Sequence, residues 1–260
     1  MKNSTLRRIN WVLAEQIGID LRKLAYAPVG LWKYALHLLE FRKAYQGTIH
    51  LMPCIHDWKD SAGSTSTEYF WQDLLVAQLI HQAQPRRHVD VGSRIDGFVA
   101  HVAAFRQIEV FDVRPLTSNI PGVVFKQADL MNQDAAMKGV TDSLSCLHAL
   151  EHFGLGRYGD PINPAGFDLG MKSLAHLLET GGSLYLSCPA GNDVVFYNAH
   201  RALAPHTVRQ QAELAGLSLK RAWLFDSNAG HLTGPHMPED VPDRPMGEHI
   251  SLGIYEFLKC

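Results

Sequence analysis

The chain has 260 residues, of which 46% are hydrophobic and 19% are charged, and its formal net charge is −2. This is the composition of a soluble globular protein with one large domain and an elaboration, or with two small domains. A chain that is almost neutral is not a general nucleic-acid binder, which needs an excess of basic residues.

The charge is unevenly distributed. Residues 1–45 hold eight Lys or Arg against three Asp or Glu, a net charge of +5, and the remainder carries −7. A basic head on an acidic body favours contact with an anionic membrane surface or a phosphorylated ligand, and a solvated helical face is the simpler alternative. No stretch approaches the roughly 18 apolar residues that cross a bilayer, and no signal-peptide pattern is seen. We expect a cytoplasmic protein, with residues 1–45 as the candidate for peripheral contact with the inner face of the membrane.

Residues 1–83 form a predicted helical N-terminal region that serves as a cap, a dimer surface or a membrane-facing surface. Apolar residues keep helical spacing at Leu6, Ile9, Leu13 and Ile17, and again at Leu31, Ala35, Leu38 and Leu39. Pro28 and Gly30 are expected to separate these two helices. A third helix begins after a capping Thr67 and stops before Pro85.

Residues 84–260 form a second predicted domain, in which short strands and helices alternate. The strand candidates are residues 87–91, 107–112, 122–126, 142–147, 182–188, 217–225 and 249–257, and the helix candidates are 97–105, 148–154, 166–179 and 205–215. This alternation predicts an α/β, Rossmann-like, doubly wound and mostly parallel sheet. The sheet has seven strands, and the last is antiparallel because a Pro- and Gly-rich loop, not a helix, precedes it.

In such a sheet the ligand lies beyond the carboxyl ends of the strands. The first strand ends in Asp90, Gly92 and Ser93, where a glycine lets the backbone approach a ligand. Asp112 follows Gly92 by twenty residues, the spacing at which an acid binds ribose hydroxyls. Asp129 and Leu130 follow the third strand. Each Asp alone could be a turn former, but together they predict a nucleoside site.

The ordered series VDVGS, EVFDVRP, QADL, SLSCLHALEHF and GGSLYLSCP resembles the class I S-adenosylmethionine (SAM)-dependent methyltransferases over roughly residues 86–226. More narrowly, VGSRIDGF, SLHALEHFGLGRYGDP and NAHR resemble a poorly characterised bacterial family associated with polysaccharide-biosynthesis genes. The resemblance implies SAM as cofactor. It places the turn at Gly92 near the methionine part, Asp112 at the ribose, Asp129 and Leu130 at the adenine, and His148 near the sulfonium.

The turn departs from the GxGxG pattern of that superfamily, because Arg94 and Asp96 occupy the later glycine positions. Arg94 has three interpretations. It points outward without effect, it points inward and pairs with the SAM carboxylate or a substrate phosphate, or it blocks the cofactor in a domain that has lost methyl transfer.

The stretch HALEH supplies the catalytic candidates His148, Glu151 and His152. It formally matches the HxxEH zinc-protease motif, but the short segment between a strand and GLGRYGDP leaves no room for the long helix that motif needs. We therefore predict no metal. Histidine and glutamate at the carboxyl end of a strand suit acid–base catalysis instead.

Two later loops supply the substrate-binding candidates, which are Arg157, Asp160, Asn198, His200 and Arg201. Amides and guanidinium groups suit a polyhydroxylated or phosphorylated ligand. No Asn/Asp-Pro-Pro-Tyr motif follows the fourth strand, which disfavours methylation of amino groups. The leading hypothesis is O-methylation of a sugar or glycan precursor. The alternatives are a sugar-modifying enzyme of the same fold without SAM, and a non-catalytic module of a glycan assembly complex.

Overall fold

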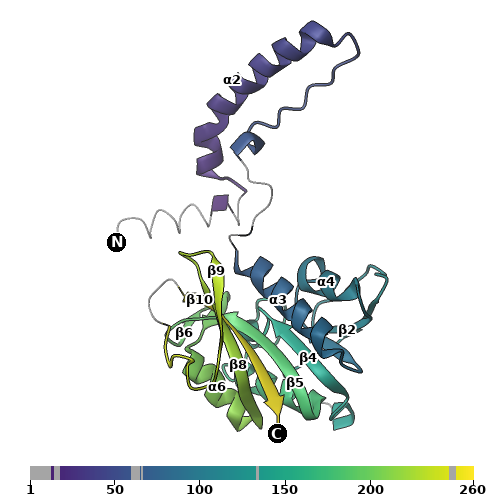
Figure 1. Cartoon of the computed structure of the whole chain (residues 1–260), viewed down its shortest axis with the longest axis vertical. Coiled ribbons are helices and arrows are strands. Elements are labelled where there is room, and N and C mark those ends of the chain that lie inside the picture. Colours follow the sequence, from purple (N-terminus) through teal and green to yellow (C-terminus); the bar gives the residue numbers. More distant parts are fainter. Residues whose placement is uncertain (1–12, 15–17, 60–64, 66, 133–134, 246–249) are drawn as a thin grey trace. The chain divides into compact units, whose positions relative to one another are not determined.

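The computed structural model describes residues 13–14, 18–59, 65, 67–132, 135–245 and 250–260 (Figure 1). The chain divides into two compact units, residues 1–64 and 65–260. Of the residues that predict the first helix, all but Leu13 lie outside the described residues. In the part of the chain that is described, no helix is both long and apolar enough to span a membrane.

The first unit contains α2 (Leu21–Ala44) and the short η2 (Asp57–Lys59). The prediction that Pro28 and Gly30 separate two helices was wrong, because α2 runs through both. An interior proline removes one hydrogen bond and crowds the carbonyl of residue i−4, but here the helix continues through Pro28. Gly30 is required for another reason: a Cβ there would lie 1.9 Å from the carbonyl oxygen of Ile55.

The second unit is built around one sheet. Its strands are β1 (His88–Val91), β2 (Ile108–Asp112), β3 (Val123–Gln127), β4 (Thr141–Leu147), β5 (Leu178–Pro189), β8 (Leu217–Asp226), β9 (His231–His236) and β10 (Ile250–Lys259). The order across the sheet is β3-β2-β1-β4-β5-β10-β8-β9. Strands β1 to β5 pair in parallel, and β10 is antiparallel to both β5 and β8. The Rossmann-like prediction is confirmed, including the antiparallel last strand.

Two segments predicted as loops contain strands. The sheet gains an eighth strand because β9, inside the predicted loop before β10, pairs with β8. The segment after β5 forms a hairpin of β6 (Val194–Phe196) and β7 (His200–Ala202). All three strands are short and have Gly, Pro or polar residues close by, so the sequence lacks the apolar alternation that marks a strand.

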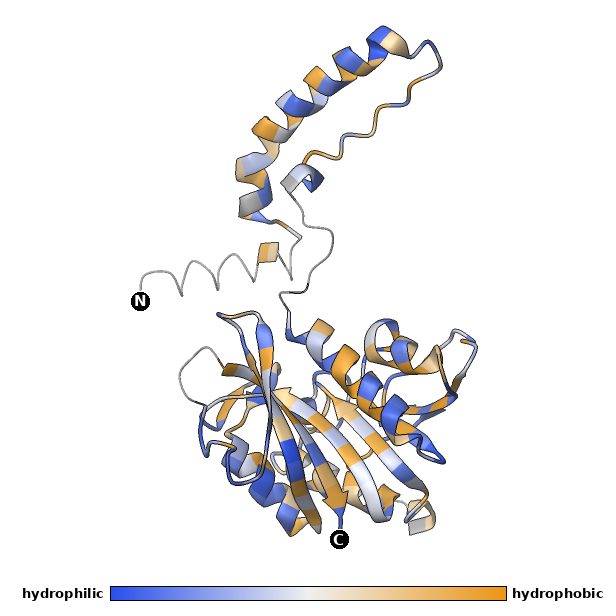
Figure 2. Ribbon diagram, in the orientation of Figure 1, coloured by the Kyte–Doolittle hydropathy of each residue, from blue (hydrophilic) through white to orange (hydrophobic). Residues whose placement is uncertain are grey.

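Helices cover both faces of the sheet, and their bounds are α3 (Glu68–Ala83), η3 (Ile95–Val99), α4 (Ala100–Ala103), η4 (Ala135–Met137), η5 (Leu150–His152), α5 (Gly166–Leu177) and α6 (Pro205–Leu214). One apolar core joins the sheet to α5 and α6. The other joins it to α3, η3 and α4. Figure 2 shows apolar residues along the strands of the sheet, as burial on both faces requires.

Helix α3 begins after Thr67, as predicted, but Thr67 makes no side-chain capping hydrogen bond. The helix is held by packing: Val76 and Ile80 are fully buried in the core with Phe98, Ile108 and Val110. The unit boundary therefore lies before α3, whereas the sequence placed this helix with the N-terminal region.

Replacement of Ile80 by Ala tests this assignment of α3. We expect the free energy of unfolding of the sheet unit to fall by about 2–5 kcal/mol, because a fully buried side chain is truncated. The measurement is urea denaturation followed by circular dichroism. Leu24→Ala, in α2 and 60% exposed, is the control and should change little. Equal effects of the two substitutions would contradict the assignment.

Candidate functional site

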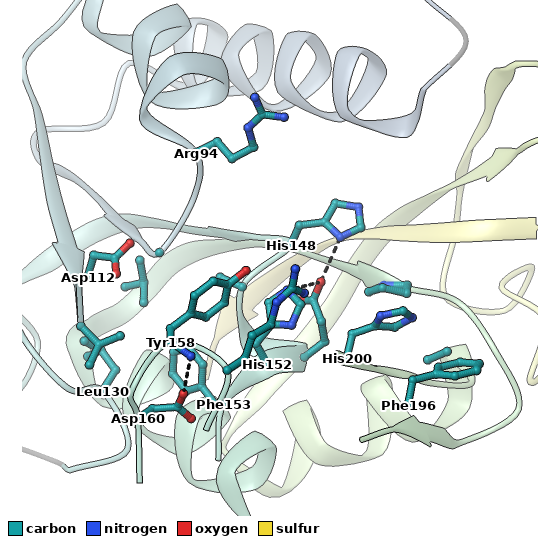
Figure 3. Close-up of a pocket in the computed structure, with 18 of the residues that line it drawn as sticks. Arg94, Asp112, Leu130, His148, His152, Phe153, Tyr158, Asp160, Phe196 and His200 are labelled. Carbon is teal, nitrogen blue, oxygen red and sulfur yellow. Dashed lines mark hydrogen bonds and ion pairs between the residues drawn. The ribbon is translucent and has the colours of Figure 1, made fainter. Parts of the chain in front are cut away.

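A cavity of about 790 Å³ opens at the carboxyl ends of β1, β2 and β4 (Figure 3). This is the switch point of the sheet, since β1 has β2 on one side and β4 on the other. The predicted residues that line it are Gly92, Arg94, Asp112, Asp129, Leu130, His148, Glu151, His152, Arg157, Asp160 and His200. Figure 3 shows the three histidines gathered on one side, with Asp112 and Leu130 on the other.

The turn after β1 brings bare backbone to the cavity. Gly92 has a φ of +72°, and a Cβ there would lie 2.9 Å from the Cβ of Ala149. Arg94 lines the cavity, and its guanidinium pairs with Asp96 at 3.0 Å. It also lies 5.4 Å from the ring centre of Tyr69. The two residues that replace the expected glycines therefore bind each other.

Asp90 and Ser93 lie beneath this turn, buried and away from the cavity surface. The Asp90 carboxylate accepts hydrogen bonds from the Ser93 hydroxyl at 2.6 Å, the Ser93 N–H at 3.0 Å and the Ser145 hydroxyl at 2.6 Å. Burial raises the pKa of Asp90 to about 6 against these hydrogen bonds. Asp90 and Ser93 were predicted to contact a cofactor, but their side chains instead hold the turn in place.

Asp112, at the end of β2, reaches the cavity but already has a partner. Arg114 binds both of its carboxylate oxygens, through Nε at 3.0 Å and a terminal nitrogen at 2.6 Å. The same guanidinium lies 4.6 Å from the ring centre of Tyr158. The side chain of Asp112 is 11% exposed and that of Arg114 is 45% exposed, so the arginine lies on the solvent side of the pair.

Asp129 and Leu130 line the cavity beyond β3. The Asp129 carboxylate accepts hydrogen bonds from the Met131 N–H and the Asn132 side-chain amide, each at 2.9 Å. Both of its oxygens thus organise their own turn, as a strand-ending Asp often does. Leu130, which is buried, adds an apolar wall.

Three predicted catalytic residues form one contact group. Glu151 is fully buried, and its Oε1 lies 2.9 Å from Nδ1 of His148 and 3.7 Å from Nε2 of His152. Burial by itself raises the pKa of Glu151, but the hydrogen bond with His148 and the charges of both histidines outweigh it and leave that pKa lowered. Glu151 is therefore the ionised centre of the group.

The two histidines differ in the hydrogen bonds that their ring nitrogens make. Nδ1 of His152 donates to the carbonyl oxygen of Ala199 at 2.6 Å, and burial lowers the pKa of His152. His148 uses Nδ1 for Glu151, and in the described residues its buried Nε2 has no hydrogen-bond partner. A neutral His148 with its proton on Nδ1 presents Nε2 as a proton acceptor.

The backbone of His148 is held as firmly as its ring. Its φ of +50° is in the left-handed region, which is uncommon for a non-glycine residue. Its N–H donates to both the carbonyl oxygen and the hydroxyl oxygen of Ser187, at 3.1 Å each. The Ser187 hydroxyl in turn donates to Gln72 in α3 at 2.5 Å. Strain of this kind persists where the surroundings fix it, and it is common at functional sites.

The predicted substrate residues divide into two groups. Arg157, Asp160 and His200 line the cavity, whereas Asn198 and Arg201 do not. Asn198 is exposed at the turn of the β6–β7 hairpin. Arg201 is 6% exposed and donates to the carbonyl oxygens of Glu151, Phe153 and Pro164. The prediction that Arg201 binds substrate is thus corrected, because its guanidinium ties η5 to the following loop.

The cavity also contains residues that the sequence did not single out. Tyr69, at the start of α3, lines the cavity and lies against His148, with ring centres 4.6 Å apart and the rings tilted by 33°. Arg114 and Tyr158 lie beside Asp112. In the sequence, only the i, i+2 spacing of Asp112 and Arg114 indicates that these two side chains could form an ion pair. Among the described residues, no group of three or more His, Cys, Asp or Glu is placed to hold a metal ion.

Comparison with known proteins supports the fold. A family model described as "Caenorhabditis protein of unknown function, DUF268" matches residues 122–223. A search among curated proteins gives no match. The N-methyltransferase NodS of Bradyrhizobium japonicum, solved with S-adenosylhomocysteine, is 13% identical, with 86% of this chain and 97% of that chain covered and a TM-score of 0.51.

Two further structures have the same TM-score of 0.51. They are the 1,6-didemethyltoxoflavin-N1-methyltransferase of Burkholderia thailandensis, 12% identical over 87% of this chain and 89% of that chain, and the [4+2]-cyclase SpnF, 14% identical over 89% and 95%. At these identities the likeness establishes the fold alone. The chain has the Rossmann-like fold of SAM-dependent methyltransferases.

Replacement of Asp90 by Asn tests the support of the turn. The folded pKa of about 6 lies above the ordinary aspartate value of 3.8, so the proton stabilises the fold below about pH 4, and this contribution is lost as the pH rises through 6. Between pH 4 and 7 the wild type should lose roughly 2–3 kcal/mol of unfolding free energy relative to Asp90→Asn. Urea denaturation at several pH values measures the difference, and parallel curves would contradict it.

Proposed function

We propose that this protein is a SAM-dependent methyltransferase that acts at an oxygen of a sugar or glycan precursor, in the biosynthesis of a surface polysaccharide. One observation carries the proposal. A single cavity at the switch point combines a bare glycine turn, two strand-end carboxylates and a buried His–Glu–His group. The first two features suit a nucleoside cofactor, and the third suits removal of a proton from a hydroxyl.

The residues present fit SAM. The backbone at Gly92 carries no Cβ, Asp112 offers a carboxylate to ribose hydroxyls, and Leu130 offers an apolar wall to adenine. Arg94, in the same turn, is the candidate for the carboxylate of the methionine part, because its side chain is 56% exposed and its ion pair with Asp96 lies at the surface. When bound, SAM supplies an electrophilic methyl group on its sulfonium.

Arg114 sets a condition on this fit. It already fills Oδ1 of Asp112 with two hydrogen bonds, from its N–H and from Nε, and Oδ2 with one. A carboxylate oxygen accepts about two hydrogen bonds, so Asp112 can accept from both ribose hydroxyls only if the Arg114 side chain turns away. The Arg114 side chain is partly exposed, so it has room to turn away into the solvent.

His148 is the proposed general base. Glu151 accepts the hydrogen bond at Nδ1, which fixes the tautomer and stabilises the imidazolium that forms when Nε2 takes the proton. Neighbouring His152 and His200 have pKa values lowered by burial, so they stay neutral near pH 7 and add no repulsion to that cation. The acceptor hydroxyl binds beside Arg157, Tyr158 and His200.

The ribose assignment predicts that Asp112→Asn weakens binding of SAM and S-adenosylhomocysteine at least tenfold, since hydrogen bonds to a charged group are lost. Isothermal titration calorimetry measures the dissociation constants. Glu109→Gln is the matched control, because it removes a carboxylate from the same strand but outside the cavity. Absence of binding to wild type at millimolar ligand would exclude the cofactor.

The base assignment predicts that His148→Gln lowers methyl transfer about 10²–10⁴-fold, the usual contribution of a general base. The assay follows labelled methyl from SAM into a panel of nucleotide-sugars. Binding of SAM should be retained, which separates loss of the base from loss of the site. His206→Gln, on α6 and outside the cavity, is the control. Undiminished transfer by His148→Gln would rule out this role.

The Arg114–Asp112 pair favours one second candidate, a sugar-modifying enzyme of this fold that does not use SAM. An arginine that stays on Asp112 leaves the carboxylate only one acceptor position, on Oδ2, so it cannot accept from both ribose hydroxyls. SpnF is a [4+2]-cyclase, so a fold of this kind also occurs in a protein that is described by a reaction other than methyl transfer. A thermal-shift screen discriminates the two candidates: stabilisation by nucleotide-sugars without any response to SAM supports the second.

A further inference from the structure

In the first unit, the chain packs against the polar face of α2 and leaves the apolar face of this helix exposed. In a globular protein, the apolar face of an amphipathic helix is the buried one. In α2, large apolar side chains at helical spacing on one face are exposed by 45–63%, and they are Leu24, Leu31, Trp32, Leu36 and Leu39. We call this set the apolar stripe. Figure 2 shows the apolar residues recurring along α2.

The opposite face of α2 is the one that the chain itself covers. The segment of residues 46–59 turns back along the helix and brings Ile55 against Gly30, which is buried. The Lys33 ammonium lies 3.6 Å from the ring centre of Trp58. Gly30 and Lys33 are small or polar residues, so this packing leaves the apolar stripe uncovered by residues 18–59.

The charges around the apolar stripe indicate what covers it. Helix α2 contains five Lys or Arg and one Glu, and Arg42 and Lys43 form its last turn. A second copy of the chain would bring two such cationic helices together. A core-like protein interface would bury the cations that end the stripe. At an anionic lipid surface, by contrast, apolar side chains enter the acyl boundary while long basic side chains reach the headgroups.

We propose that α2 lies in the surface of an anionic membrane, with the apolar stripe inserted and its basic residues at the headgroups. Trp32 is in the middle of the stripe, and Trp side chains favour the membrane interface. The stripe is about 22 Å long between residues 24 and 39, from the helical rise. The helix binds in the plane of the surface and does not cross it.

The test is co-sedimentation of the full chain with vesicles. One set is phosphatidylcholine alone, and the other contains equal parts of phosphatidylcholine and phosphatidylglycerol. We expect binding to the anionic vesicles that weakens as salt is raised, and at least tenfold weaker binding to the neutral ones. Trp32→Ser with Leu36→Ser should reduce anionic-vesicle binding at least tenfold. Arg42→Ser with Lys43→Ser should reduce the preference for anionic vesicles.

Leu214→Ser is the matched control, because Leu214 is 68% exposed on α6 in the other unit, and it should bind like wild type. Circular dichroism checks that each variant is folded. Failure of the wild type to bind at low salt, or equal binding by the stripe variant, overturns the proposal. It is also overturned if analytical ultracentrifugation shows a dimer that Trp32→Ser dissolves, or if the stripe variant lowers thermal stability without vesicles, since the stripe is then covered by protein.

Discussion

The position of the whole site depends on one buried carboxylate. Asp90 binds Ser93 in the turn after β1 and Ser145 in β4, and Ser93 in turn accepts the N–H of Leu147. These hydrogen bonds fasten the glycine turn to the carboxyl end of the neighbouring strand. The register of the two strands, with Asp90 opposite Ser145, makes the connection possible. The next residue after β4 is His148, so the cofactor turn and the base candidate share one support.

A second buried acid, Glu151, organises the chemistry in the same way. A fully buried carboxylate is costly unless it is paired, and its pairing with His148 and His152 offsets that cost. Arg201 lies behind it and donates to the carbonyl oxygens of Glu151 and Phe153. The helical turn that carries Glu151 is thus held from outside the cavity, which leaves the acid free to orient the histidines.

The strand-end residues could be predicted because parallel strands place their carboxyl ends at one edge, whatever the details of packing. Asp112, Asp129 and His148 reach the cavity for that reason. The direction in which each side chain points could not be predicted in the same way. Asp90 and Arg201 were expected at the ligand, but their partners are Ser145 and Pro164, which are distant in sequence. Pro28 also misled the prediction, because an interior proline usually kinks or breaks a helix but α2 continues through it.

Two similar Arg–Asp pairs border the cavity, and one of them occupies the irregular turn after β1. Arg94 binds Asp96 and Arg114 binds Asp112, each two residues apart, and both guanidinium groups border the same cavity. The Arg94–Asp96 pair is exposed, and such a pair contributes only about 0–1 kcal/mol, so exchange of Asp96 for the carboxylate of a ligand, or for a phosphate, costs little. Arg94 then offers a cation to an incoming anion when it leaves Asp96, and Arg114 uncovers an acid when it leaves Asp112. An arginine in the glycine turn is therefore compatible with a nucleotide ligand, because its resting partner, Asp96, is exposed and competes only weakly.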